Sequence, residues 1–583
     1  MSDANVTTYL LDRLAAAGVD RIFGVPGDFT LAMLDDIDAH GSVAWVGCAN
    51  ELGAGYAADG YARIRGLGVV CTTFGVGELS AINAIAGAYA EHVPVLHVVG
   101  SPATATQAAA RATHHTLGDG DFGHFARMAA EVTQVQAVLT VENAAEEIDR
   151  VIRETLAARR PGYLLIPADV AAAPLAAPSA DLAAVEAEAA DAEVLADLRD
   201  AVAAALEGAS SVAVLADILV QRMGAERALH DLLALGVPHA VSLWGRRVVD
   251  ESVPHYAGPY VGAVSEPAAR SVVEDADVLV LAGVQFTDLM SGFFSQHLPE
   301  TTIDIGPRRT RIGDREFGPV PMAEALGVVA DAIDDARAAG RLVLPGVATS
   351  ASAASTTTAA DAATAAAAPV TAGTGPAASD DPDAPLTQAA LWDAVSAQLR
   401  SGDVVIADQG TAFYGMGTHR MPAGVTFIGQ PLWASIGYTL PALLGAALAD
   451  RSRRPIVLIG DGAAQLTVAE LGTLARDRVP AVVLVVDNGG YTVERAIHGR
   501  TAAYNDIAGW DWAALAAAFD PTGFALGARA TTAAEVADAF ARHDARGDGL
   551  TVIQAVVPPL DVPPLLSALA EAAARANRAT SQG

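Results

Sequence analysis

One pattern repeats over most of the chain: short runs of apolar, strand-like residues alternate with longer stretches of helical character. Continuous apolar runs of this kind are typical of parallel strands that are covered by helices on both faces of the sheet. The pattern occurs in three segments, and it therefore predicts an α/β protein with three doubly wound parallel-sheet domains. The predicted strands are 22–25, 43–48, 68–73, 95–100 and 163–167 in the first segment, 212–216, 278–282 and 302–305 in the second, and 404–407, 456–459 and 481–486 in the third.

Stretches of low hydrophobicity separate the three segments and set the predicted domain boundaries. The first domain is expected at 1–180 and the second at 186–345. Residues 346–385 consist almost entirely of Ala, Ser, Thr, Gly, Pro and Asp, contain no aromatic residue and show no periodic face. This composition indicates a flexible linker, so the third domain is expected at 386–583.

Composition excludes several classes of function. All 36 basic residues are arginine, because the sequence contains no lysine, and this excludes Gly-Lys-Ser/Thr phosphate loops and enzymes that use a Schiff-base lysine. The net charge of −32 opposes binding to nucleic acid or to an anionic membrane. Residues 431–449 carry no charge, but their prolines and glycines favour a buried helix over a membrane span. With no signal peptide visible at the N-terminus, the expected location is cytoplasmic.

The most specific chemical signal lies in the third domain, where two predicted strands run into Gly460-Asp461-Gly462 and Asp487-Asn488-Gly489-Gly490. Both turns follow the carboxyl ends of parallel strands, which is the ligand-binding edge of an open α/β sheet. The glycines let a phosphate approach the backbone, and a helix predicted to begin near Leu466 would direct its N-terminus to an anion. The side-chain oxygens, with a carbonyl from the second turn, form a partial ligand set that suits Mg²⁺.

This pair of turns, in which Asn488 follows Asp461 by 27 residues, resembles the diphosphate-anchoring motif of the thiamin-diphosphate-dependent 2-oxo acid decarboxylases, of the pyruvate, indolepyruvate, phenylpyruvate and branched-chain types. The family has Asn where this chain has Asp487, and often Ser where it has Ala463, but neither difference removes a metal ligand. The resemblance covers nearly the whole chain except the linker. The sequence of residues 490–499 is most similar to that of indolepyruvate and branched-chain enzymes. Further matching segments are 24–29, 48–52, 112–118, 408–411 and 432–438.

The resemblance implies thiamin diphosphate and Mg²⁺ as cofactors and assigns residues to both. Ile436 would stand between the two cofactor rings, and Glu51 would hydrogen-bond the pyrimidine ring. The expected metal ligands are Asp461, Asn488 and Gly490, and the expected cofactor contacts are Glu51, Gly410, Thr411, Ile436, Asp461, Gly462, Asn488 and Gly490.

The resemblance also implies a proton-relay cluster above the cofactor. Taken alone, the adjacent His114 and His115 read more often as solvated loop residues, and Glu51 as a carboxylate that favours a helix N-terminus. Their matching contexts reverse that reading. The expected catalytic residues are Asp28, Glu51, His114, His115 and Glu494.

Four positions match residues of the family's substrate pocket: Phe413, Tyr414, Val493 and Ile497. Val493 is smaller than the Ile of pyruvate-specific relatives, and the segment 565–570 offers small residues where some relatives have bulky ones. Both features predict a branched or aromatic 2-oxo acid rather than pyruvate as the preferred substrate.

The predicted function is the non-oxidative decarboxylation of a 2-oxo acid to an aldehyde and CO₂. The alternatives are a carboligating relative such as acetolactate synthase and a cofactor-binding protein without catalysis. An NAD-dependent dehydrogenase is disfavoured, because the glycine patterns at 53–58 and 75–80 lack the third glycine of a dinucleotide fingerprint. In the family, domains of different subunits face each other across the cofactor, so we expect a homodimer or homotetramer with shared sites.

Overall fold

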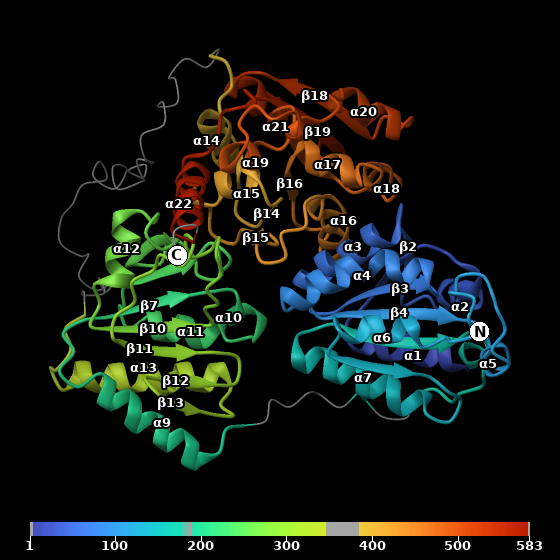
Figure 1. Cartoon of the computed structure of the whole chain (residues 1–583), viewed down its shortest axis with the longest axis horizontal. Helices are drawn as coiled ribbons and strands as arrows, with labels where there is room; N and C mark the ends of the chain where they lie inside the picture. The colour runs from blue at the N-terminus through green and yellow to red at the C-terminus, as the bar shows by residue number, and fades with distance from the viewer. Residues whose placement is uncertain (1–3, 179–180, 183–188, 345–383, 581–583) are drawn as a thin grey trace.

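The computed structural model describes residues 4–178, 181–182, 189–344 and 384–580. These residues form three units, each built on one sheet that helices cover (Figure 1). The predicted fold class, α/β with three doubly wound sheets, is therefore confirmed. The predicted linker at 346–385 lies outside the described residues, apart from its last two positions.

The N-terminal domain carries a sheet of six parallel strands. Its strands are β1 (Arg21–Gly24), β2 (Ala44–Gly47), β3 (Gly68–Thr73), β4 (Val95–Ser101), β5 (Val135–Val138) and β6 (Gly162–Pro167). Its helices are α1 (Val6–Ala16), α2 (Leu31–His40), α3 (Glu51–Arg65), α4 (Val76–Ala90), α5 (Thr104–Ala108), α6 (His124–Ala130), α7 (Ala144–Ala158) and α8 (Ala168–Ala171). The strand order is β2-β1-β3-β4-β6-β5. The edge strand β5 was not predicted, because it buries only alternate residues and so lacks a continuous apolar run.

The central domain carries a sheet of seven strands in the order β13-β12-β11-β10-β7-β8-β9. The strands are β7 (Val212–Ala216), β8 (His239–Ser242), β9 (Tyr256–Tyr260), β10 (Val278–Ala282), β11 (Thr301–Ile305), β12 (Thr310–Ile312) and β13 (Arg315–Phe317). The helices are α9 (Ala192–Ala205), α10 (Leu219–Arg222), α11 (Glu226–Leu233), α12 (Pro267–Glu274) and α13 (Met322–Ala338). Strands β12 and β13 pair antiparallel, so this sheet is mixed, because connections as short as theirs cannot cross over to a parallel neighbour.

The C-terminal domain again has six parallel strands, in the order β15-β14-β16-β17-β19-β18. They are β14 (Val404–Ala407), β15 (Thr426–Ile428), β16 (Pro455–Gly460), β17 (Ala481–Asp487), β18 (Ala525–Ala530) and β19 (Leu550–Val556). The helices are α14 (Gln388–Gln398), α15 (Thr411–Met416), α16 (Thr439–Ala449), α17 (Asp461–Thr467), α18 (Glu470–Arg476), α19 (Thr492–Ile497), α20 (Trp512–Phe519), α21 (Ala533–Arg546) and α22 (Pro564–Thr580). Strands β18 and β19 occupy a region for which the sequence pattern predicts only helix.

The N-terminal and C-terminal domains pack on each other through α3 and α16. A Cβ atom on Gly60 would lie 2.2 Å from the carbonyl oxygen of Ala442, and one on Gly445 would lie 1.8 Å from that of Ala57. The two helix backbones therefore meet at distances that only glycine permits. This contact fixes where the C-terminal sheet lies relative to the N-terminal sheet within one chain (Figure 1).

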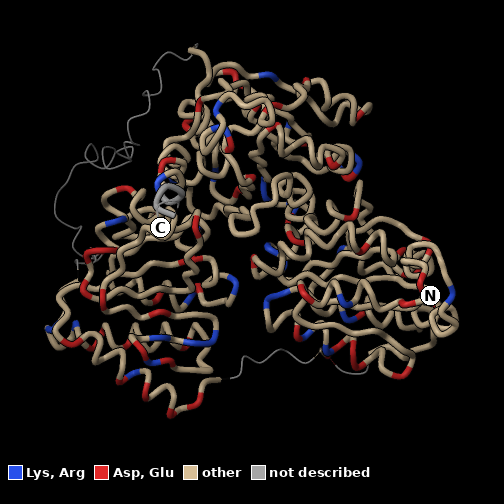
Figure 2. Tube along the Cα trace, viewed as in Figure 1, with Lys and Arg blue, Asp and Glu red and all other residues tan. Residues whose placement is uncertain are grey.

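The uncharged stretch at 431–449 contains α16, and every residue of α16 is buried, as the sequence predicted. In the part of the chain that the structure describes, no helix is both long and apolar enough to cross a bilayer. Acidic residues are distributed along the chain in all three domains (Figure 2).

Candidate active site

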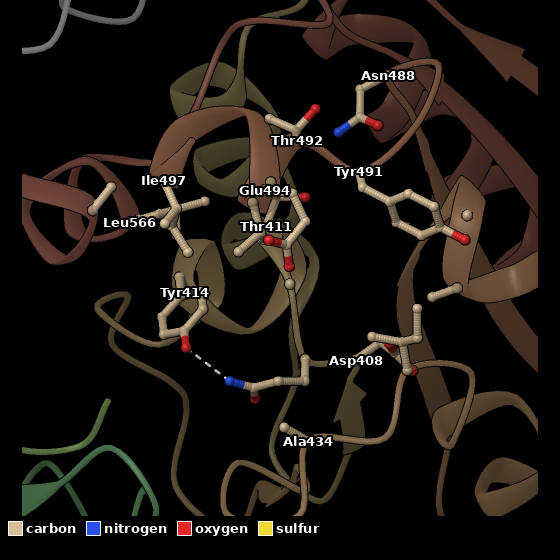
Figure 3. Close-up of a pocket in the computed structure, with 18 of the residues that line it drawn as sticks. Asp408, Thr411, Tyr414, Ala434, Asn488, Tyr491, Thr492, Glu494, Ile497 and Leu566 are labelled. Carbon is tan, nitrogen blue, oxygen red and sulfur yellow. Dashed lines mark hydrogen bonds between the residues drawn. The ribbon is translucent and has the colours of Figure 1, made fainter. Parts of the chain in front are cut away.

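A cavity of about 260 Å³ opens at the carboxyl edge of the C-terminal sheet (Figure 3). Its walls come from the turns after β14, β16 and β17, from the segment after β15, from α15, α19 and α22, and from Leu289 and Phe293 of the central domain. Eleven of the residues that the sequence predicted for the site line this cavity: Gly410, Thr411, Tyr414, Ile436, Asp461, Gly462, Asn488, Gly490, Val493, Glu494 and Ile497.

Asp461 connects the two turns that the motif singled out. Its Oδ2 atom accepts hydrogen bonds from the backbone N–H groups of Asn488, Gly489 and Gly490 at 3.2, 2.7 and 3.2 Å, and its Oδ1 accepts from Gly462 at 2.7 Å. Burial raises the pKa of the Asp461 carboxyl to about 6. A buried carboxylate with a raised pKa is a group that a bound cation would stabilise.

The helix after β16 begins at Asp461 itself, five residues earlier than the predicted start near Leu466. Gly460, Asp461, Gly462 and Ala463 all line the cavity, so the first turn of α17 forms part of its wall. A Cβ atom on Gly462 would lie 2.7 Å from the ring of Tyr491, so any larger residue there would have to displace that ring. This wall suits a phosphate group, since backbone N–H groups at a helix start favour anions.

The side chain of Asn488 lies close to both Asp461 and Gly490. One end of the Asn488 amide lies 3.2 Å from Asp461 Oδ1 and 2.8 Å from the Gly490 carbonyl oxygen, and the other end lies 3.1 Å from Thr492 Oγ1. Two oxygens that bind one Mg²⁺ at roughly 2.1 Å and at right angles are about 3 Å apart, so these separations fit an octahedral site.

The two possible orientations of the Asn488 amide correspond to two kinds of site: its nitrogen faces Asp461 and Gly490 in a hydrogen-bonding site, and its oxygen faces them in a metal site. Hydrogen bonding alone would turn the nitrogen toward Asp461 and Gly490, because both present acceptors. In Figure 3 the nitrogen is drawn on the Thr492 side, and a cation held by Asp461 and Gly490 would require this orientation, because the amide oxygen would then face both of them. Thr492 can accept from that nitrogen, because its own hydroxyl donates to the carbonyl oxygen of Pro559 at 2.9 Å.

Two buried carboxylates hold the segment that carries Ile436 into the cavity. Asp408 accepts from the N–H groups of Gly437 and Thr439 and from the Thr439 hydroxyl, the last at 2.8 Å. Burial raises the pKa of Asp408 to about 6. At the other end of the segment, Glu91 accepts from the N–H groups of Leu432 and Trp433 at 2.9 and 3.2 Å.

Neither carboxylate was predicted to have a role. Asp408 lies in a matched motif, directly after a predicted strand, and that position was the available signal. Glu91 bonds to residues more than 340 positions away, and no local pattern reports such a contact.

The far end of the cavity is apolar and lies between α15, α19 and α22. Tyr414 lines it and accepts a hydrogen bond from Gln409 Nε2 at 2.8 Å (Figure 3). Glu494 is an exposed carboxylate at the same place. The sequence did not single out individual residues of α22 or of the central domain for this wall. They are Leu566, Leu569, Ala570, Leu289 and Phe293.

Phe413 differs from the other predicted pocket residues. It is 1% exposed and is not among the described residues that line the cavity. Its ring lies 5.8 Å from that of Phe427, measured between ring centres, and a Cβ atom on Gly429 would lie 2.5 Å from it. Phe413 is therefore part of the core, because its helix turns it inward while the neighbouring Tyr414 reaches the cavity.

The predicted histidine pair lies in the N-terminal domain, next to Asp28. His114 Nε2 is 2.7 Å from Asp28 Oδ2, His115 Nδ1 is 3.9 Å from Asp28 Oδ1, and Phe29 stacks on His114. His115 has a φ of 61°, and its carbonyl oxygen would lie 2.0 Å from a Cβ atom on Gly75. We call Asp28, His114 and His115 the histidine cluster. Its two hydrogen-bonded side chains are exposed, at 61% for His114 and 46% for Asp28.

Glu51 is the first residue of α3 and is half-buried. Among the described residues, neither Glu51 nor any member of the histidine cluster lines the cavity. Within one chain, the structure thus joins Glu494 to the predicted cofactor-binding residues and joins Asp28 to the two histidines, but it leaves these two groups apart.

Comparisons with known proteins find similarity along nearly the whole chain. Three family models match it: the N-terminal TPP binding domain of thiamine pyrophosphate enzymes at residues 4–140, their central domain at 199–338 and their C-terminal TPP binding domain at 411–555. An alpha-keto-acid decarboxylase of Mycobacterium leprae (strain TN) is 49% identical over 98% of this chain and 96% of its own length. One of Mycobacterium ulcerans (strain Agy99) is 50% identical over 97% and 95%.

A solved structure also resembles this one. It is the thiamine diphosphate-dependent 4-hydroxybenzoylformate decarboxylase of Rhodococcus jostii RHA1, with a TM-score of 0.73 over 95% of this chain and 99% of that chain. At 20% sequence identity the likeness concerns the fold.

Proposed function

Because the chain belongs to the alpha-keto-acid decarboxylase family of thiamine pyrophosphate enzymes, we propose that it is a carboxy-lyase that converts a 2-oxo acid to an aldehyde and CO₂ without oxidation. The observation that carries this proposal is the sequence identity of 49 and 48% to two alpha-keto-acid decarboxylases, over 96% of the length of each. The cytoplasmic location expected from the sequence stays a prediction.

The proposed metal is Mg²⁺. The Asp461 carboxylate, the Asn488 side-chain oxygen and the Gly490 carbonyl would hold it, and phosphate oxygens and water would complete its shell. The separations of 3.2 and 2.8 Å between the Asn488 amide and, respectively, Asp461 Oδ1 and the Gly490 carbonyl oxygen support this assignment. Thiamine diphosphate would lie with its diphosphate at the first turn of α17, with Ile436 between its rings and with Gly410 and Thr411 at the pyrimidine. When bound, the cofactor supplies the electron sink that decarboxylation requires.

The residues of this chain supply orientation, exclusion of water and proton transfer. The apolar end of the cavity would hold the substrate side chain away from water. Glu494 reaches the cavity from α19 and is the proposed proton donor on this side. The histidine cluster and Glu51 are proposed to act from the opposite side, the former in proton transfer and the latter on the pyrimidine ring.

The opposite side is proposed to come from a second copy of the chain. The histidine cluster does not line the cavity of its own chain. Exposed apolar side chains lie beside it: Leu31 and Leu117 are close to it in sequence, Val76 follows Gly75, on which the histidine loop lies, and the three are 52, 61 and 56% exposed. Apolar residues beside a polar cluster mark a surface that a partner covers. We therefore propose a homodimer or homotetramer with sites shared between subunits.

The proposed substrates are branched or aromatic 2-oxo acids. Val493 and Ala570 are small, and Leu566, Leu569 and Ile497 make the surrounding wall apolar. A cavity of this kind gains more from a large apolar side chain than from the methyl group of pyruvate.

The test is aldehyde release from pyruvate, 3-methyl-2-oxobutanoate, 4-methyl-2-oxopentanoate, phenylpyruvate and indolepyruvate, with and without thiamine diphosphate and Mg²⁺. We expect release that depends on both cofactors, with pyruvate the poorest substrate. A strict preference for pyruvate would overturn the substrate assignment. Bound cofactor without any aldehyde would overturn the decarboxylase proposal in favour of carboligation or of binding without catalysis.

A further inference from the structure

Arg495 is buried on α19, between residues that line the cavity, but it is not itself among the described lining residues. Its side chain is 6% exposed. The guanidinium donates to six oxygens, at 2.8 to 3.4 Å. They are the carbonyl oxygens of Asn488, Gly489, Asn505 and Pro559, the hydroxyl of Thr492 and the carboxylate of Asp506.

The turn at 488–490 is held between Asp461 and this arginine. Asp461 accepts from all three backbone N–H groups of the turn, while Arg495 donates to the carbonyl oxygens of Asn488 and Gly489 at 3.1 and 2.8 Å. The guanidinium thereby engages two of the three carbonyl groups of the turn. The Gly490 carbonyl is left for the metal; it accepts one hydrogen bond, from Thr492 N–H, and keeps a second lone pair.

The turn needs such a restraint from outside. Gly489 and Gly490 have φ values of 68° and 137°, and glycine has the largest freedom to leave such conformations. A planar guanidinium with fixed donor directions orients neighbouring carbonyl groups in a way that a single ammonium group cannot.

Arg495 also bears on the orientation of the Asn488 amide. It donates to Thr492 Oγ1 at 3.3 Å and lies 3.4 Å from the Pro559 carbonyl oxygen, to which the Thr492 hydroxyl donates. With its hydrogen used in this way, the Thr492 oxygen can only accept further bonds. The nitrogen of the Asn488 amide is then favoured on the Thr492 side, and its oxygen faces Asp461 and Gly490.

We propose that Arg495 is the positioning residue of the metal site: it orients the carbonyl groups of the 488–490 turn and, through Thr492, the amide of Asn488, so that their oxygens meet Mg²⁺. This inference rests on the proposed function, since it requires Mg²⁺ and thiamine diphosphate at this turn. Residues that orient metal ligands typically change metal affinity by about 10- to 100-fold when they are substituted.

The experiment compares Arg495→Met and Arg495→Lys with Arg454→Met in the full chain. Arg454 is a matched control, because it is a mostly buried arginine of the same domain that bonds Asp403, Asp544 and the Gln398 carbonyl, and it does not line the cavity. Retained thiamine diphosphate is measured by equilibrium dialysis against increasing Mg²⁺, and unfolding temperature by circular dichroism.

We expect the Mg²⁺ concentration for half-maximal cofactor retention to rise at least about tenfold for Arg495→Met and by less for Arg495→Lys. Arg454→Met should lower the unfolding temperature without moving that concentration. An unchanged Mg²⁺ requirement in Arg495→Lys, or in a folded Arg495→Met, overturns the positioning role. If the unsubstituted chain retains no cofactor at any Mg²⁺ concentration, the proposed function fails. If the unsubstituted chain and the variants retain the cofactor equally, only the positioning role of Arg495 fails.

Discussion

The N-terminal and C-terminal sheets share one strand order, second-first-third-fourth-sixth-fifth along each domain, but they hold their polar groups differently. In the C-terminal domain, Asp408, Asp461 and Asn488 are at most 4% exposed. In the N-terminal domain, the side chains of Asp28 and His114 are about half exposed. The same edge of the same topology is thus a closed binding cavity in one domain and an open surface in the other.

The difference arises from what covers each edge. Over the C-terminal sheet, α19, α22 and two residues of the central domain enclose the cavity. Over the N-terminal sheet, the histidine loop lies on Gly75, and exposed apolar side chains flank it. One half can hold a ligand within its own chain, while the other needs a second surface to be completed.

Hybrid dimers test this comparison most directly. The Glu51→Gln and Asp461→Ala chains are each expected to lose at least about a hundredfold in activity, since each lacks a group placed at the cofactor. Random mixing makes half of the dimers hybrid, each with one intact site in two, so activity should recover to about a quarter of that of the unsubstituted enzyme.

The measurement is aldehyde release after the two chains are unfolded and refolded together, with each variant refolded alone as the control. Hybrids shown by mass spectrometry to have formed, but without recovered activity, would mean that both halves of a site come from one chain.

Substrate preference tests whether the closed half sets specificity by itself. Ala570→Leu adds three carbons to the cavity wall on α22, so the ratio of kcat/KM for 4-methyl-2-oxopentanoate to that for pyruvate should fall about tenfold. Ala568→Leu, on the same helix but not among the described lining residues, is the matched control and should leave the ratio unchanged. Equal ratios in both variants would place the specificity outside this wall.

The parts of the fold that the sequence predicts best are strands buried on both faces. Strands β3, β7, β10 and β14 have the predicted bounds, because their apolar runs are continuous. The edge strands β5 and β18 bury only some of their residues, and the buried β19 carries polar residues such as Gln554, so the pattern misses them.

The candidate site divides along a similar line. Residues in short local motifs, such as Asp461 and Asn488, are found from sequence because strand ends bring them to one edge. Glu91, Asp408 and Arg495 support the site through contacts with distant segments or with backbone atoms, and no spacing rule reports such contacts. Phe413 and Tyr414 are adjacent on one helix, and only packing decides which of them reaches the cavity.

The N-terminal and C-terminal sheets each have a buried carboxylate after their third strand. The dependence of stability on pH distinguishes the roles of these two carboxylates. Asp461 lies at the proposed cation, whereas Glu78 on α4 accepts from the Gly75 N–H and the Tyr163 hydroxyl at 2.8 and 2.7 Å. Burial raises the pKa of Glu78 to about 7, above its usual 4.5. The folded chain then binds this proton more tightly than the unfolded chain, so the free energy of unfolding should fall as pH rises from 4.5 to 7, by about 3 kcal/mol at most.

Glu78→Gln should remove this dependence, because glutamine does not titrate. The unfolding midpoint of Glu78→Gln minus that of the unsubstituted chain should therefore increase between pH 5 and pH 8. Glu147→Gln is the control: its hydrogen bond to Arg150 holds the pKa of Glu147 below its usual value, so its contribution to stability changes only below that value, and its midpoint difference should stay constant between pH 5 and pH 8. A midpoint difference for Glu78→Gln that stays constant with pH would show that Glu78 is ionised in the folded chain, and the parallel between the two buried carboxylates would then be limited to their geometry.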